Sequence, residues 1–122
     1  MNDTYDPESS GPERGDARFE LVDLFLRRSV AEVEQMRRDV PRLIEGDDAA
    51  WRELRLNAQR IGGMAGSLEL GVLSACAGEL AQLAEERFNR ANIDAHFLLS
   101  VTSAIEMVAI ELNELFRDSP RR

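Results

Sequence analysis

The chain has 122 residues, of which 43% are hydrophobic and 31% are charged, and its formal net charge is −8. This length and apolar content are enough for one domain with a single core, and the acidic balance argues against a nucleic-acid partner, which requires basic patches. The single cysteine, Cys76, excludes a framework of intrachain disulfides, and no uninterrupted apolar run reaches the roughly 18–20 residues of a membrane span.

Residues 1–16 contain Pro7 and Pro12 and lack apolar periodicity, which predicts a disordered acidic tail. The segment lacks the basic stretch followed by an apolar stretch that is typical of a signal peptide, so no signal peptide is predicted. Residues 17–45 are predicted to be helical, because apolar side chains recur mostly at three- and four-residue steps. These side chains are Phe19, Val22, Leu26, Val30, Val33, Met36, Val40 and Leu43. Pro41 lies inside this pattern and either kinks the helix or restarts it.

The second predicted helix has the clearest pattern. It follows the run Gly46-Asp47-Asp48, which supplies a stop and then an N-cap. Its apolar residues are spaced three, four, three, four and three apart, which is typical of the buried seam of a helix bundle. They are Trp51, Leu54, Ala58, Ile61, Ala65 and Leu68.

Two further helices complete the domain. The third begins at Leu70 or Gly71, and after a turn over residues 89–92 the last helix is capped by Asn92 or Asp94 and ends at residues 118–120. Their predicted inward residues are Leu73, Ala77, Leu80 and Leu83, and then Phe97, Val101, Ile105, Val108, Leu112 and Leu115. Strand patterns are absent, and short connections favour antiparallel neighbours. We therefore predict an all-α antiparallel four-helix bundle over residues 17–118, with or without a short extra helix at its N-terminal end.

A second stripe runs beside the buried seam of the second helix and is predicted to face away from the core. Each glycine inside a helix costs about 0.8–1 kcal/mol relative to alanine, so three of them need a reason. Small residues allow close helix packing, but the seam already has two alanines for that purpose. We interpret the stripe as a face left bare for the approach of another protein. Its residues are Arg52, Arg55, Leu56, Gln59, Gly62, Gly63 and Gly66.

Residues 58–68 of this helix resemble the active-site helix of the histidine phosphotransfer (Hpt) domain family. The family pattern is roughly Ala-His-x-Leu-Lys-Gly-x-Ala-x-x-Leu/Val-Gly. It is matched by Ala58, Ile61, Gly63, Ala65 and Leu68. Gln59 stands at the histidine position, Gly62 at the usual lysine and Glu69 at the usual closing glycine. With the flanking helices included, the resemblance covers residues 19–115.

The resemblance implies a two-component phosphorelay module whose partners are response-regulator receiver domains or sensor histidine kinases. It also implies that Gln59 lies on the docking face. An imidazole nitrogen accepts a phosphoryl group, whereas the amide nitrogen of glutamine is not nucleophilic. The chain as written is therefore expected to be no enzyme, to need no cofactor and to act in the cytoplasm.

Two origins of Gln59 remain open. The chain is either a natural pseudo-phosphotransfer domain that competes for partners, or a genuine phosphotransfer protein with an engineered change of histidine to glutamine. A third interpretation is a structural or oligomerising bundle without a relay role, in which the glycines serve tight packing.

The remaining candidate residues have simpler interpretations. Arg52, Arg55 and Arg60 lie on or beside the stripe, where they either contact an acidic partner or form local pairs on a solvated face. His96 is expected to be an ordinary exposed or hydrogen-bonded histidine, and Cys76 a buried structural thiol. One histidine and one cysteine do not make a zinc site, so no metal is predicted.

Overall fold

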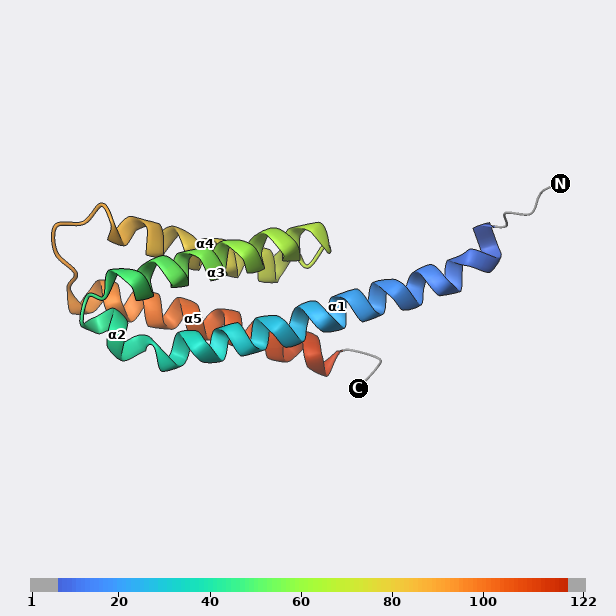
Figure 1. Ribbon diagram of the computed structural model, residues 1–122, viewed down its shortest axis with the longest axis horizontal. Coiled ribbons are helices and arrows are strands. Elements are labelled where there is room, and N and C mark those ends of the chain that lie inside the picture. The colour runs from blue at the N-terminus through green and yellow to red at the C-terminus, as the bar shows by residue number, and fades with distance from the viewer. Residues whose placement is uncertain (1–6, 119–122) are drawn as a thin grey trace.

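The computed structural model describes residues 7–118, and side-chain surroundings from residue 17 onward; within this range the chain is helical and has no strands. The helices are α1 (Pro7–Arg38), α2 (Val40–Ile44), α3 (Asp48–Ser67), α4 (Gly71–Arg87) and α5 (Ala95–Arg117). The four long helices run alternately up and down, with α3 beside α4 and α1 beside α5 (Figure 1). The predicted antiparallel four-helix bundle is confirmed, and the short extra helix follows the first long helix instead of preceding it.

The core is built from the inward side of each long helix. Trp51 of α3 is fully buried and stacks on Phe97 of α5, with ring centroids 6.0 Å apart. All six seam residues predicted for α3 are buried, as are Leu73, Ala77 and Leu80 of α4. Phe19 differs from the prediction, because it lies at the outer part of α1 and is 42% exposed.

Pro41 separates the first predicted helix into α1 and α2. Its ring nitrogen carries no N–H, and its ring blocks the carbonyl of the residue four positions earlier. The last turn of α1 accordingly closes at Asp39, whose N–H donates to the carbonyl of Gln35 at 2.9 Å. Proline fits the first turn of a helix, so α2 starts at Val40 with Pro41 in that turn.

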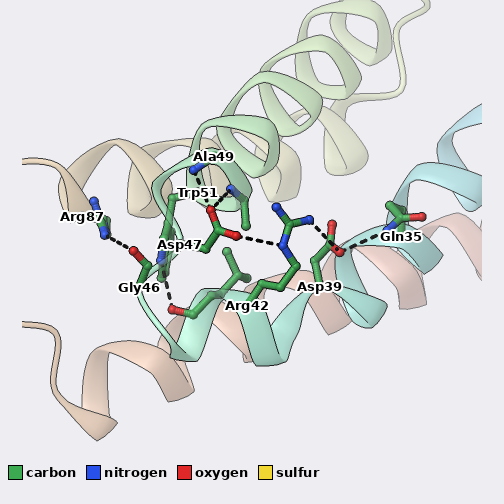
Figure 2. Close-up of polar contacts among 10 residues, drawn as sticks. Gln35, Asp39, Arg42, Gly46, Asp47, Ala49, Trp51 and Arg87 are labelled. Atoms are coloured by element: carbon green, nitrogen blue, oxygen red, sulfur yellow. Dashed lines mark hydrogen bonds and ion pairs between the residues drawn. The ribbon is translucent and has the colours of Figure 1, made fainter.

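The α2–α3 corner is fixed by polar contacts at the base of the bundle (Figure 2). Asp47 caps α3, accepting from the N–H groups of Ala49 at 3.0 Å and Ala50 at 3.3 Å. The hydrogen bond from Arg42 and those from these N–H groups hold the pKa of the Asp47 carboxyl below its usual value. The Trp51 indole Nε1 donates to the carbonyl of Leu43 at 3.0 Å, which ties the buried ring to α2.

Arg87 of α4 holds the same corner from the other side. Its guanidinium donates to the Gly46 carbonyl at 3.0 Å, pairs with Asp48 at 2.7 Å and lies over the Trp51 ring. Because these contacts join α4 to the start of α3, they set the direction in which α3 leaves the corner.

Helix α1 begins within the segment that the sequence analysis predicts to be a disordered tail. Residues 7–16 are the first turns of α1, which extend beyond the ends of α3 and α4 (Figure 1); residues 1–6 lie outside the described range. Proline is suited to the first helical position, and adding residues to an existing helix gains one hydrogen bond for each residue fixed. Apolar periodicity does not reveal such a segment, because it projects beyond the bundle.

Among the described helices, α5 alone is long and apolar enough to cross a membrane by length and composition. Its inward side, formed by Phe97, Val101, Ile105, Val108 and Leu112, belongs to the bundle core. Its outward side exposes Leu99, Met107 and Ile110.

The turn between α3 and α4 places Glu69 in the left-handed region, at φ 63°. The N–H of Glu69 donates to the Gly66 carbonyl at 3.1 Å and that of Leu70 to the Ala65 carbonyl at 2.8 Å, which is a Schellman ending. Glycine adopts this conformation without the steric cost that a Cβ brings.

We therefore expect Glu69→Gly to raise the free energy of unfolding by about 1 kcal/mol, measured by urea denaturation. Glu69→Gln is the control, because it removes the charge and keeps the Cβ. An equal gain in both variants would show that the charge, and not the backbone, carries the cost.

Candidate functional site

The outer face of α3 is poor in side chains around Gln59. Gln59 is exposed, and one turn further along the helix Gly63 is exposed as well. A Cβ added at Gly63 would meet no atom within 4 Å, so nothing in the described part of the chain covers this position. Leu56, one turn before Gln59, is 54% exposed, and Arg52 is exposed a further turn away. These four residues form what we call the Gln59 face.

Gly62 does not lie on this open face, which corrects the prediction. It is buried against α4, where an added Cβ would lie 3.5 Å from the Gly78 nitrogen and the Ser74 carbonyl oxygen. The Ser74 hydroxyl also donates to the Gly62 carbonyl at 2.9 Å. The residue is 60° from Gln59 around a helix with 3.6 residues per turn, which is far enough to reach the neighbouring helix. Gly62 is therefore a packing residue.

Gly66 is intermediate between these two cases. It is exposed, but an added Cβ would lie 3.3 Å from the Ser74 hydroxyl oxygen. Any larger residue would push on the side chain that bonds to Gly62. Gly66 thus borders the Gln59 face and also belongs to the α3–α4 contact.

Arg55 lies on the α4 side of the Gln59 face. It is half-buried, its guanidinium pairs with Glu85 at 3.1 Å, and it lies 5.3 Å from the centre of the Phe88 ring. Both partners belong to the C-terminal end of α4 or the residue after it, so Arg55 joins two helices of the bundle. The pair with Glu85 is neither a local pair on a solvated face nor a contact with another protein, because it joins two helices of the same bundle.

Arg60 lies on the opposite side, toward α1. It donates to the Asn57 side-chain oxygen at 2.6 Å and to the Glu32 carboxylate of α1. Glu32 also accepts from Arg28 at 3.2 Å. Asn57 is a local partner, three residues away on the same helix, whereas the longer-range partner Glu32 is not readable from helix spacing.

An apolar groove runs between α1 and α3 beside the Gln59 face. Its volume is about 180 Å³, and Arg60 and Met64 of α3 form part of its wall. Apolar side chains at its rim are largely open to solvent: Leu24 is 66% exposed and Leu21 50%. The Ser29 hydroxyl, buried at the groove, has no hydrogen-bond partner among the described residues.

The sequence analysis missed this groove. Its rim residues come from two helices about forty positions apart, and each has the ordinary spacing of an amphipathic helix. The one available signal was that Leu21 and Leu24 fall outside the three- and four-residue seam of α1, where polar residues are usual. Apolar residues in such positions predict an exposed apolar surface.

The other candidate residues lie away from this face. His96 is exposed at the start of α5. Cys76 of α4 is half-buried against the core, and burial raises the pKa of its thiol. No group of three or more His, Cys, Asp or Glu side chains that could hold a metal ion occurs among the described residues.

The fold and the face together define a helical-bundle module with an open, side-chain-poor surface on its second long helix. The chain belongs to the Hpt domain family, whose sequence profile matches residues 20–118. It is therefore a phosphorelay module of two-component signalling, a class whose members generally interact with response regulators and histidine kinases. No curated protein and no solved structure is significantly similar to the chain.

The two neighbouring glycines are expected to respond in opposite ways to substitution. Gly63→Ala should raise the free energy of unfolding by about 0.5–1 kcal/mol, because it improves helix propensity at an open position. Gly62→Leu should lower it by about 1–3 kcal/mol, because a larger side chain overpacks the α3–α4 contact. Urea denaturation of both variants beside the wild type measures the difference. A Gly62→Leu variant as stable as the wild type would contradict the close helix approach.

Proposed function

We propose that this protein binds receiver domains of response regulators through the Gln59 face without carrying a phosphoryl group at position 59. Gln59 would occupy the place of the phosphoacceptor histidine. The observation that carries the proposal is the open surface around an exposed Gln59, with Gly63 uncovered one turn away. The proposal includes a cytoplasmic location and no catalytic activity of the chain itself.

The chemistry of the amide supports the second half of the proposal. The lone pair of the glutamine nitrogen is delocalised into its carbonyl group, so the nitrogen donates hydrogen bonds but does not attack phosphorus. The side chain still reaches a distance similar to that of histidine. It can keep contacts with a docked partner while phosphotransfer is lost, which makes the protein a competitor in a phosphorelay.

The apolar groove supports the first half. Exposed apolar surface beside the Gln59 face is what a protein partner buries on docking. Leu21, Leu24 and Met64 supply this surface on the α1 side. The groove therefore extends the predicted docking face from α3 onto α1.

The alternative interpretation, a structural or oligomerising bundle, explains why some positions of the stripe are glycine but not all of them. Gly62 and Gly66 contact α4 within one molecule, so their smallness is explained without any partner. Gly63 has no such explanation. Since it costs helix stability and touches nothing, its smallness favours an intermolecular contact.

Docking is tested by two substitutions with matched controls. Gly63→Arg and Leu24→Asp should each weaken binding to a receiver domain at least tenfold, because they add bulk to the open face and a charge to the groove rim. Ser103→Arg and Leu99→Asp are the controls on α5, where Leu99 is 64% exposed. Affinities are measured by isothermal titration calorimetry with receiver domains encoded in the same genome. Equal losses in variants and controls would contradict the docking face.

The acceptor position is tested by Gln59→His. If the surroundings of position 59 remain competent, the variant should gain an acid-labile, base-stable phosphoryl label from a phosphorylated receiver, and the wild type should gain none. The label is followed by autoradiography, with His96→Gln added to exclude the native histidine. A labelled wild type would contradict the proposal. An unlabelled variant would indicate that Gly62 and Glu69 have removed the rest of the acceptor site.

A further inference from the structure

The arginines that border the Gln59 face already form ion pairs with carboxylates of the same chain. Arg55 pairs with Glu85 on the α4 side, and on the α1 side Arg60 pairs with Glu32. A partner's phosphoryl group arriving at Gln59 would have to draw one of these guanidiniums away from its carboxylate. On the α4 side the released Glu85 carboxylate would stand near the phosphoryl anion without its partner, whereas on the α1 side Glu32 would keep its pair with Arg28. In both cases a carboxylate stays near the anion, so part of the attraction gained would be offset by repulsion.

The next nearest arginines are also engaged. Arg28 shares the Glu32 carboxylate with Arg60, at 3.2 Å. Arg18 of α1 donates to the Leu68 carbonyl at 2.7 Å and lies 3.9 Å from the Glu69 carboxylate, beyond the C-terminal end of α3. Neither is placed to hold an anion at the centre of the Gln59 face.

Arg52 is the remaining cation on this face. Its backbone precedes that of Gln59 by two helical turns, about 10.5 Å along the axis at 1.5 Å per residue, and side chains of a helix lean toward its N-terminus, which directs Arg52 away from Gln59. Exposed charges separated by about a Debye length, roughly 8 Å at physiological ionic strength, interact weakly. Arg52 therefore contributes little attraction to a phosphoryl group held at Gln59.

Apart from Arg52 at its end, the face is uncharged, since its other residues are Leu56, Gln59 and Gly63 and the bordering Gly66 adds no side chain. The Gln59 amide can donate to a phosphoryl oxygen, but it donates equally well to the carboxylate oxygen of an unphosphorylated aspartate. A phosphoryl group on the partner gains no contact that the bare carboxylate lacks.

Building on the proposed function, we infer that the Gln59 face binds its receiver partner irrespective of the partner's phosphorylation. The protein would occupy receivers before and after they are phosphorylated, and would thus withhold both forms from other phosphorelay proteins. This regulation follows from charge placement and is independent of whether position 59 itself accepts phosphate.

The test compares the affinity for one receiver domain in its two states. Calorimetric titrations use a receiver domain with Mg²⁺ alone and with Mg²⁺ plus beryllofluoride, which mimics the aspartyl phosphate. The wild-type chain should bind the activated receiver no more than twofold tighter than the unmodified one. A greater preference for the activated receiver overturns the inference. Absence of binding in both states contradicts the proposed function instead, so the two failures are distinguishable.

A charge added beside Gln59 supplies the matched variant. Leu56→Lys places an ammonium group one turn from Gln59 at an exposed position, and Leu56→Gln removes the same apolar side chain without adding charge. Leu56→Lys should favour the activated receiver at least fivefold, whereas Leu56→Gln should keep the wild-type ratio. Both variants bind the same two states of the receiver. A change in receiver shape therefore affects both affinity ratios equally and cancels when they are compared. Equal ratios for the two variants would show that missing charge is not the cause.

Discussion

The close approach of α3 and α4 at Gly62 determines how the rest of the surface is arranged. An added Cβ at Gly62 would lie 3.5 Å from the α4 backbone and 3.6 Å from the Ala77 Cβ, and Ala58 and Ala65 are small buried residues of the same helix. A helix held this closely along one side has little freedom to rotate about its own axis. Gln59 and Gly63 must then face solvent, because they lie beyond the edge of that contact. The openness of the Gln59 face is thus a consequence of tight packing beside it.

Most of the fold is predictable from the sequence because the buried seams repeat at helical spacing. The six seam residues of α3 and the cap at Asp47 are readable one helix at a time. The position of Gly62 is not, since a residue at the edge of the seam is buried or exposed according to how near the next helix lies. The groove formed by Leu24 and Met64 also depends on the separation of two helices, which no single-helix pattern contains.

The contacts of the arginines show the same limit of prediction from the sequence. Helix spacing finds the pair of Arg60 with Asn57, three residues apart, but not its contact with Glu32, which is 28 positions away. That distant contact matters for the proposed function, because a guanidinium that is paired beside the Gln59 face is less available to an incoming anion. Exposed pairs of this kind add little to stability, typically 0–1 kcal/mol, so their main consequence here is for recognition.

On the Gln59 face, the features needed for docking can be separated from those needed for phosphotransfer. In the proposed function, docking uses an extended surface: the uncovered helix around Gly63, the α3–α4 contact behind it and the apolar groove toward α1. Phosphotransfer would depend on one nucleophilic atom and on cations placed to hold the phosphoryl oxygens. The surface is present, whereas Gln59 offers an amide and the neighbouring guanidiniums face carboxylates. Under the proposed function, the features that phosphotransfer needs are absent together, while Gly63 still costs helix stability at an uncovered position. This combination is what distinguishes the proposed binding face from an acceptor site.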